Sequence, residues 1–516
     1  MVREGETKMD LTRKQFLARG AAFTGLGMFG GGRMLLAGAG AMDGRKPRLV
    51  LGVLSDIHIR RSGIGEEASE ANNSITFRHA LEWFRSEGVD AVVISGDMAD
   101  WGLDENLMAV SEAWYSVFPD NKYPDGRLVE KVFVTGNHDW GGFNMAGGIG
   151  KRLYPDKAEF NRHILQADLP GWWDKAFHEQ YTPIYSKQIK GFTFIGSHWH
   201  PVSRGNDGFG RIGEWLAANG QRLDPSRPFF YVQHPHLKDT CYGSWAWGHD
   251  SGAATKALAP FPNAIAISGH SHFSLTDERS VWQGAFTSIG AASLQNIEMP
   301  YNEFPPVGYE NTNATGRDAW KYNSTKMMGN ISGRDCRQGM LWKVYDDVMV
   351  VKRHEFLSGL DLGPDWIIPL TVTEPKPFSF TERAKKMRAP EFPTGATIKV
   401  SVVKAKTRGG KARGSAEIVK SVIKDAFKVS VPAIKPESGS RLFRLEFSAV
   451  SADGKAKKKL VLAEGFNHSP ESNKAVSAQS CIFAKDELGE GDVRFTVTPM
   501  NCFGARGKPL VGEYQA

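Results

Sequence analysis

The hydrophobic pattern of the chain is dominated by short continuous apolar runs, each followed at once by polar residues. These runs are rich in β-branched and aromatic side chains and cover residues 49–54, 91–94, 132–134, 229–232 and 264–267. A continuous run of this length is typical of a strand that is buried on both faces of a sheet. We therefore expect a buried sheet whose strands end in polar loops.

A helix is predicted between the first two runs. Phe77, Leu81 and Phe84 recur at intervals of four and three residues, which places them on one face of a helix, and Gly88 follows as a stop signal. The order strand, helix, strand recurs to about residue 295, which is the pattern of an α/β domain. Ligands of such domains bind beyond the carboxyl ends of the strands, so the polar loops are the expected active site.

These polar loops carry residues of the types that bind metal ions. They read Ser55-Asp56-Ile57-His58, Gly96-Asp97-Met98-Ala99-Asp100, Gly136-Asn137-His138-Asp139, Gln233-His234-Pro235-His236 and Gly269-His270-Ser271-His272. Each segment alone is common, but the ordered set supplies carboxylates, imidazoles and an amide. Such a mixed set suits Mn, Fe, Zn, Ni or Co better than Mg or Ca, because imidazole is a borderline-soft ligand.

In this order the five segments resemble the pattern of the calcineurin-like metallophosphoesterase superfamily, D-x-H, G-D, G-N-H-D/E, H and G-H-x-H. The resemblance covers residues 48–295 and implies a four-layer α-β-β-α sandwich with two central sheets. It also implies two divalent transition-metal ions that share Asp97 as a bridge. The first ion would be completed by Asp56, His58 and His272. The second ion would be completed by Asn137, His234 and His270.

The resemblance gives two further residues a role toward the substrate. His138 would stabilise charge at the phosphoryl oxygens or protonate the leaving group, and Asp139 would orient its imidazole, as carboxylates often do for histidine. The nucleophile would be a metal-bound hydroxide, because a bound ion lowers the pKa of water toward neutrality. No serine or cysteine nucleophile is needed, and the sequence has no Gly-x-Ser-x-Gly elbow.

Several polar residues beside these motifs have two interpretations. Asp100 is expected to support a ligand or a turn rather than to bind a metal. His236 lies close enough to His234 to be mistaken for the ligand. The histidines of segment 198–200 either line the pocket or lie on a surface loop. The arginines of segment 60–61 either contact a phosphate or are ordinary basic loop residues.

The first 41 residues are predicted to be an export signal rather than part of the fold. Segment 12–17 reads Thr-Arg-Lys-Gln-Phe-Leu, a weakly apolar stretch follows over 21–32, and small residues occupy 37–41. This resembles a bacterial twin-arginine signal with Lys14 in place of the second arginine, and it implies a periplasmic or secreted protein. The alternative is an N-terminal tail without a targeting role. No apolar run reaches 18 residues, so no transmembrane helix is expected.

At 516 residues the chain is too long for one hydrophobic core, and a second domain is expected after the first. The α/β domain is assigned to residues 46–357, and a proline-rich linker to 358–395. Strand-like segments then follow at 397–403, 427–431, 442–449, 459–463 and 493–499. Their spacing predicts a β-sandwich over 396–516. Residues 495–504 resemble the last strands of a fibronectin type III or Ig-like domain.

Two features between and within these domains remain open. Residues 298–335 form a long segment rich in aromatic residues, either a substrate-binding wall or a strap that packs between domains. A hairpin is predicted directly after it, over 339–345 and 348–351. Cys481 and Cys502 either pair as a disulfide or remain free thiols.

The positive charge of the chain is concentrated in one segment. Residues 383–459 contain 20 Lys and Arg against 6 Asp and Glu, an excess of 14, whereas the whole chain has a net charge of +7. This segment is either a solvated face or a region that binds weakly to anionic lipid or polysaccharide. Nucleic acid is not an expected partner, because no DNA- or RNA-binding motif is present.

Together these features predict an exported dinuclear-metal phosphoesterase that acts on a small phosphate ester. Phosphodiesters are favoured, since segment 210–234 is similar to family members that act on cyclic nucleotides and other diesters. The first alternative is a phosphomonoesterase or nucleotidase. The second is a surface-binding or adhesion protein with a relict catalytic fold, against which the complete ligand set and His138 argue.

Overall fold

The computed structural model describes residues 44–60, 69, 72–140, 153–199, 208–242, 248–298, 335–406, 410–411, 418–419, 422–435, 441–463, 465–475 and 479–516. The predicted export signal over 1–41 and nearly all of the aromatic segment 298–335 lie outside these ranges, as do Arg61 and His200.

The first sheet has the strand order β12-β11-β10-β1-β2-β3, with β13 paired to β11. Its strands are β1 (Leu49–Leu54), β2 (Ala91–Ser95), β3 (Glu130–Val134), β10 (Gln338–Val344), β11 (Val348–Glu355), β12 (Leu360–Asp361) and β13 (Trp366–Pro369). β1, β2 and β3 run parallel, and β10 pairs antiparallel with β1. The predicted hairpin is confirmed as β10 and β11.

The second sheet has the strand order β4-β5-β6-β7-β9-β8. Its strands are β4 (Ile184–Ile189), β5 (Phe192–Ser197), β6 (Phe229–Val232), β7 (Ala264–Ser268), β8 (Val281–Gln283) and β9 (Thr287–Gly290). β5, β6, β7 and β9 are mutually parallel. Both central strands, β6 and β7, are buried along their whole length, as their continuous apolar sequences predict.

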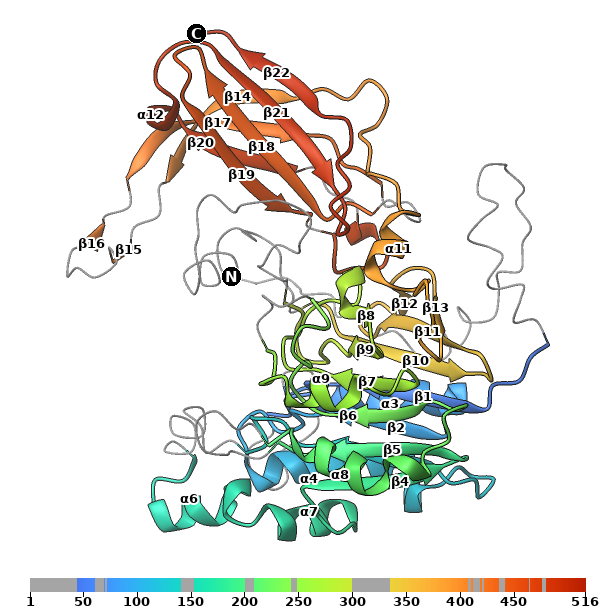
Figure 1. Ribbon diagram of the computed structural model, residues 1–516. Helices are drawn as coiled ribbons and strands as arrows, with labels where there is room; N and C mark the ends of the chain where they lie inside the picture. The colour runs from blue at the N-terminus through green and yellow to red at the C-terminus, as the bar shows by residue number, and fades with distance from the viewer. Residues whose placement is uncertain are drawn as a thin grey trace. The chain divides into compact units, whose positions relative to one another are not determined.

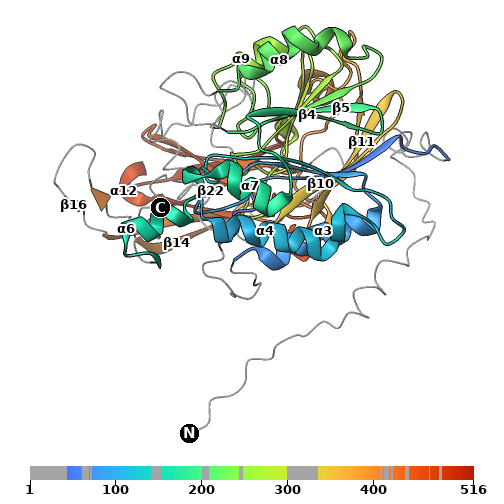
Figure 2. The same cartoon turned by 90° about the horizontal axis from the view of Figure 1, so that it is seen from below.

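The two sheets pack face to face between two layers of helices (Figure 2). Leu51 and Val53 point into the shared core between the sheets, whereas the alternate residue Leu54 packs on the outer side. The helices that cover the first sheet are α3 (Ser74–Glu87), α4 (Asp104–Val117) and α7 (Leu169–Phe177), and those over the second are α8 (Arg211–Asn219) and α9 (Ala253–Leu258). This confirms the expected α-β-β-α sandwich.

The predicted helix over Phe77, Leu81 and Phe84 is α3, and all three side chains are fully buried against the first sheet. It ends at Gly88, whose φ of 73° is the left-handed conformation that glycine adopts without steric cost. A further short helix, α6 (Lys157–His163), begins at Asp156, whose side chain accepts a hydrogen bond from Glu159 N.

The C-terminal domain consists mainly of two antiparallel sheets (Figure 1). One has the order β14-β17-β20 and the other β19-β18-β21-β22. Their bounds are β14 (Lys399–Lys406), β17 (Ile423–Val431), β20 (Gln479–Ala484), β18 (Arg444–Ser451), β19 (Ala456–Leu462), β21 (Val493–Met500) and β22 (Leu510–Tyr514). Phe427, Phe447, Phe483 and Phe495 meet in one core, so the predicted β-sandwich is confirmed.

The boundary between the domains differs from the expected linker over 358–395. β12 and β13 extend the first sheet, and Trp366 and Ile368 enter its core. The short helix α11 (Phe380–Ala384) follows, and its buried Arg383 binds Glu278 at 2.6 Å. The expected linker therefore contains two strands, and in β13 the proline is the last residue, so the apolar residues before it pair with β11.

All four cysteines lie in the described part of the chain and are free thiols, so Cys481 and Cys502 do not form a disulfide in this structure. Among the described helices, none has the length and apolar content to cross a bilayer.

Candidate metal centre

The five polar loops meet at the carboxyl ends of β1, β2, β3, β6 and β7. Because these strands belong to two facing sheets, ligands that are far apart in the sequence converge at one edge. The loops bring together all seven predicted metal ligands in two groups that contact each other. The first group consists of Asp56, His58 and His272. The second group consists of Asp97, Asn137, His234 and His270. Asp56, Asp97 and His234 are each at most 1% exposed.

The first group joins β1 to the loop after β7. His272 Nε2 lies 3.1 Å from Asp56 Oδ1 and 3.1 Å from His58 Nε2. His58 Nε2 is in turn 3.6 Å from the same carboxylate oxygen. One carboxylate oxygen and two imidazole nitrogens therefore surround a single small volume.

The second group forms around His234 Nε2. This atom lies 3.0 Å from Asp97 Oδ2, 3.1 Å from Asn137 Oδ1 and 3.1 Å from His270 Nδ1. Asp97 Oδ2 is also 3.7 Å from His58 Nε2, which belongs to the first group. Asp97 thus lies between the two groups, as a residue shared by two ions must.

Hydrogen bonds to the outer imidazole nitrogens show that this donor set fits metal ions. His234 Nδ1 donates to Ser95 O at 2.8 Å, and His272 Nδ1 donates to Asn296 O at 3.1 Å. His58 Nδ1 donates to the Asp100 carboxylate at 2.8 Å. Each proton is therefore on the outer nitrogen, and bare lone pairs face one another across the site. Such lone pairs repel at these distances unless a cation lies between them.

The electrostatics of His234 agree with this interpretation. Burial lowers its pKa, but the charge of Asp97 and the hydrogen bond to it outweigh burial and raise the pKa to about 9. Asp56 Oδ1 is buried and has no hydrogen-bond partner in the described part of the chain. The site thus attracts positive charge, and a metal ion takes the place that a proton would otherwise occupy.

The backbone at this site is in an uncommon conformation. Five of the candidate ligands have positive φ angles between 50° and 74°: Asp56, His58, Asp97, His270 and His272. Such angles are unfavourable for residues with a Cβ atom and cluster at functional sites. The glycines of the motifs have a different reason: a Cβ atom on Gly136 would overlap Asp97, and one on Gly269 would overlap Ser55 and Asp56.

His138 lies beside the ligands with its side chain 23% exposed, and its orientation comes from Asp100. Its Nδ1 donates to Asp100 O at 2.8 Å, and its backbone N donates to Asp97 Oδ1 at 2.8 Å. Burial lowers the pKa of His138, but Asp97 and Asp100 outweigh it and raise the pKa to about 10. A bound cation would lower that value again, because like charges disfavour protonation.

The role expected of Asp139 must therefore be corrected. Its carboxylate accepts hydrogen bonds from Ala99 N and Gly136 N, both at 2.7 Å, so it fixes the backbone of two ligand loops instead of orienting His138. Asp100 was expected to support a ligand or a turn. Its carboxylate contacts both His58 and His138 and also accepts a hydrogen bond from Arg60 Nε at 2.8 Å. Arg60 is thus engaged with a carboxylate.

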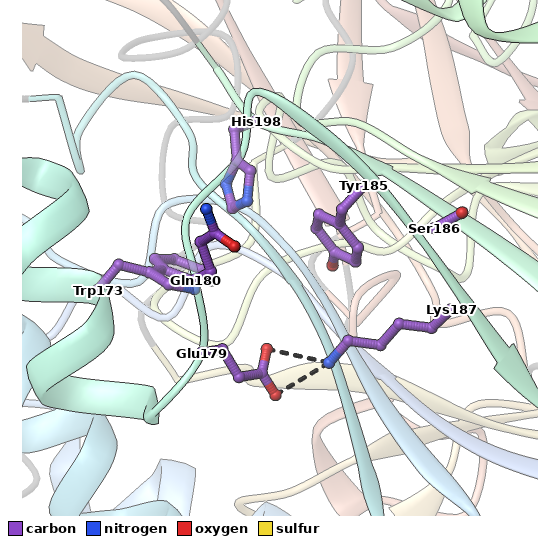
Figure 3. Close-up of a pocket in the computed structure, with 7 residues that line it drawn as sticks. All are labelled: Trp173, Glu179, Gln180, Tyr185, Ser186, Lys187 and His198. Carbon is purple, nitrogen blue, oxygen red and sulfur yellow. Dashed lines mark hydrogen bonds and ion pairs between the residues drawn. The ribbon is translucent and has the colours of Figure 1, made fainter.

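His198 does not face the metal ligands. Its Nδ1 accepts a hydrogen bond from Thr135 N at 3.1 Å, behind the loop that carries Asn137. It lines a cavity of about 330 Å³ with Trp173, Tyr185 and the Lys187–Glu179 ion pair (Figure 3). Burial, with Arg211 and Lys187, lowers the pKa of His198 to about 3.

Three residues near the centre were not singled out by sequence reasoning. The ring of Trp199 lies 6.2 Å from that of His270, between centroids. Ser271 Oγ contacts His236 Nε2 at 2.6 Å. Glu298 N donates to His272 O at 2.8 Å, and burial raises the pKa of its carboxyl group. Only the position of Ser271, between two motif histidines, offered a sequence signal.

Residues 49–274 match the model of the calcineurin-like phosphoesterase family, and this match supports a metal-dependent phosphoester hydrolase. Solved structures similar to this chain include a dimetal phosphatase from Danio rerio. The two sequences are 14% identical, the match covers 63% of this chain and 100% of the phosphatase chain, and the TM-score is 0.33. A purple acid phosphatase from yellow lupin is 13% identical, the match covers 62% of this chain and 53% of the lupin chain, and the TM-score is 0.39. No curated protein matches the chain.

Proposed function

We propose that the protein is an exported phosphodiesterase that works with two divalent transition-metal ions. The observation that supports it most is the convergence of bare imidazole lone pairs and carboxylate oxygens in two groups that share Asp97. Asp56, His58 and His272 would hold the first ion, and Asn137, His234 and His270 the second. When bound, the ions supply Lewis acidity, which lowers the pKa of water and offsets charge on the phosphoryl oxygens.

The remaining chemistry is assigned to the chain's own residues. His138 keeps one proton on Nδ1, which it donates to Asp100 O, and its side chain is partly exposed. With a second proton on Nε2, the imidazolium form can protonate the leaving oxygen or stabilise phosphoryl charge. Asp100 holds His58 and His138 in one network, so that ligand and proton donor keep a fixed separation. Asp139 keeps the two ligand loops together through their backbone.

The preference for a diester follows from the charges around the site. A phosphomonoester brings two negative charges near neutral pH, whereas a diester brings one. Arg60, which follows the first ligand loop, is bound to Asp100, so the positive charge next to the ligands in the described part of the chain would come from the two ions and from His138 when it is protonated. This amount of positive charge suits a monoanionic ester better than a dianionic one.

A comparison of two chromogenic substrates tests this proposal. The metal-free protein is reconstituted in turn with Mn, Zn, Ni, Co and Fe, and assayed on bis(p-nitrophenyl) phosphate and on p-nitrophenyl phosphate. A higher kcat/KM on the diester with at least one metal supports a phosphodiesterase. Faster turnover of the monoester would favour the phosphatase or nucleotidase alternative, and inactivity with every metal on both esters would contradict the proposal.

Export is tested separately with the N-terminal segment. Residues 1–45 fused to a reporter that is exported only after folding should deliver it to the periplasm, and Arg13→Gln should abolish delivery. A reporter that remains inside the cell with the native segment would contradict the export part of the proposal and leave the enzymatic part standing.

A further inference from the structure

A second cluster of metal-binding residue types lies at the start of β10 and shares no residue with the metal centre. Asp335 and Cys336 lie just before this strand, which begins at Gln338, and His468 follows β19 in the C-terminal domain. Cys336 Sγ lies 3.4 Å from Nδ1 and 3.8 Å from Nε2 of His468. His468 Nε2 lies 3.5 Å from Asp335 Oδ2. One sulfur, one nitrogen and one oxygen ligand atom are thus within reach of a common point.

Two kinds of chemistry use cysteine, histidine and aspartate at such distances: a nucleophilic triad and a metal site. A nucleophile must meet a substrate, but Cys336 is 0% exposed and His468 is 7% exposed. Burial also raises the pKa of the Cys336 thiol, which opposes a free thiolate. A metal ion needs only a small closed space, so burial favours the metal site.

We propose that Asp335, Cys336 and His468 bind a structural Zn²⁺ ion. Zinc binds thiolate sulfur at about 2.3 Å, imidazole nitrogen at about 2.0 Å and carboxylate oxygen at about 2.1 Å in a tetrahedral arrangement, which separates sulfur from nitrogen by roughly 3.5 Å. The Sγ to His468 distances of 3.4 and 3.8 Å bracket that value. A water molecule would take the fourth position, and binding releases the thiol proton to solvent.

The neighbouring residues leave one oxygen of Asp335 available for the ion. Lys474 Nζ binds Asp335 Oδ2 at 2.9 Å, and this is the oxygen that lies 3.5 Å from His468 Nε2. The other oxygen, Oδ1, lies 3.9 Å from Cys336 Sγ and can bind the ion. Asn467, next to His468, is 1% exposed, and both polar atoms of its side chain lack a hydrogen-bond partner in the described ranges. Buried polar atoms without partners often mark a place where an ion or an ordered water is bound.

The ion would reinforce a connection that the protein already makes. Gln338 Nε2, in β10, donates to Asn467 O at 2.9 Å, so the same strand and the same loop are joined by a hydrogen bond. This site is separate from the metal centre in its residues and in its ligand chemistry, since the centre contains no sulfur ligand. The two can therefore be observed independently.

Cobalt substitution of the full-length protein tests the proposal without a variant. A thiolate bound to Co²⁺ gives an intense charge-transfer absorption in the near ultraviolet, whereas nitrogen and oxygen ligands do not, so the signal reports only on the Cys336 site. The native protein should show this band, and addition of Zn²⁺ should remove it. Absence of the band from the folded, cobalt-loaded protein would overturn the proposal, whatever its activity on phosphate esters.

Two variants identify the ligands. Cys336→Ser should abolish the band and lower the zinc content of the purified protein by about one ion per chain. Cys481→Ser, at a buried cysteine outside the cluster, is the matched control and should change neither. A band that survives Cys336→Ser, or reaction of Cys336 with a small alkylating reagent in the native zinc-loaded protein, would contradict the site.

Discussion

The imidazole of His236 joins Ser271 to Ser268, with Nε2 at 2.6 Å from Ser271 Oγ and Nδ1 at 2.8 Å from Ser268 Oγ. Ser268 ends β7, and Ser271 lies between the candidate ligands His270 and His272. Burial keeps the pKa of His236 well below its usual range, so the ring is neutral and uses one nitrogen to donate and the other to accept. The histidine that looked like a competing ligand instead fixes the ligand loop.

His236→Phe should therefore weaken metal binding without removing a ligand. Residues that hold metal ligands in place commonly contribute about 10–100-fold to metal affinity, and we expect a loss near the lower end. Competition with a chelator measures the affinity directly. His178→Asn, at an exposed residue with a φ of 54°, is the control and should leave the affinity unchanged. Equal affinities for His236→Phe and the native protein would contradict this role.

Asp97→Asn should reduce occupancy of both metal sites, because its carboxylate lies between His234 and His58. Asp56→Asn, in contrast, should affect mainly the first site. Elemental analysis after dialysis separates the two outcomes. Retention of both ions by Asp97→Asn would mean that Asp97 does not bridge them.

His138→Ala should leave the metal content intact and lower kcat by about 10²–10³-fold, the usual effect of losing one group that stabilises a transition state. The raised pKa of His138 and the hydrogen bond from its Nδ1 to Asp100 O both favour a protonated imidazole. A fall in metal content parallel to the fall in rate would show that His138 is a ligand.

Asp100 and Asp139 should respond differently to the same change. Asp139→Asn removes an acceptor for a buried backbone N–H and should destabilise the fold by about 1–3 kcal/mol, measured by urea unfolding. Asp100→Asn should instead change the pH dependence of kcat, since its contacts are with His58 and His138. The opposite pattern would return the orienting role to Asp139.

His198 should make the metal-free protein less stable in mild acid. Its pKa is about 3 when folded against an ordinary value of 6.5, so the unfolded chain binds the extra proton between these values. Stability should fall below about pH 6.5 by up to about 1.4 kcal/mol per pH unit from this residue. His198→Gln should flatten that dependence in urea unfolding at pH 7, 6 and 5. Identical slopes would show that His198 is not buried as a neutral ring.

The sequence predicted the strands that carry ligands better than it predicted their connections. The apolar runs match β1, β2, β6 and β7 within one residue, because a strand buried on both faces needs an uninterrupted apolar sequence. β20 and β22 were missed since Ser480 and Gly512 interrupt their apolar character. The partner of His138 was misassigned because its hydrogen bond goes to a backbone carbonyl, and no residue type signals that.

The antiparallel pairing of Leu49 with Val344 makes the order of events during synthesis unusual. β1 is among the first strands to leave the ribosome, yet its neighbour β10 emerges only after the whole second sheet has been made. Closing so long a loop is slow, and an unpaired apolar strand edge invites aggregation while it waits. The edge of β1 that pairs with β10 therefore stays open until translation has passed about two thirds of the chain, whereas its other edge can pair with β2 much earlier.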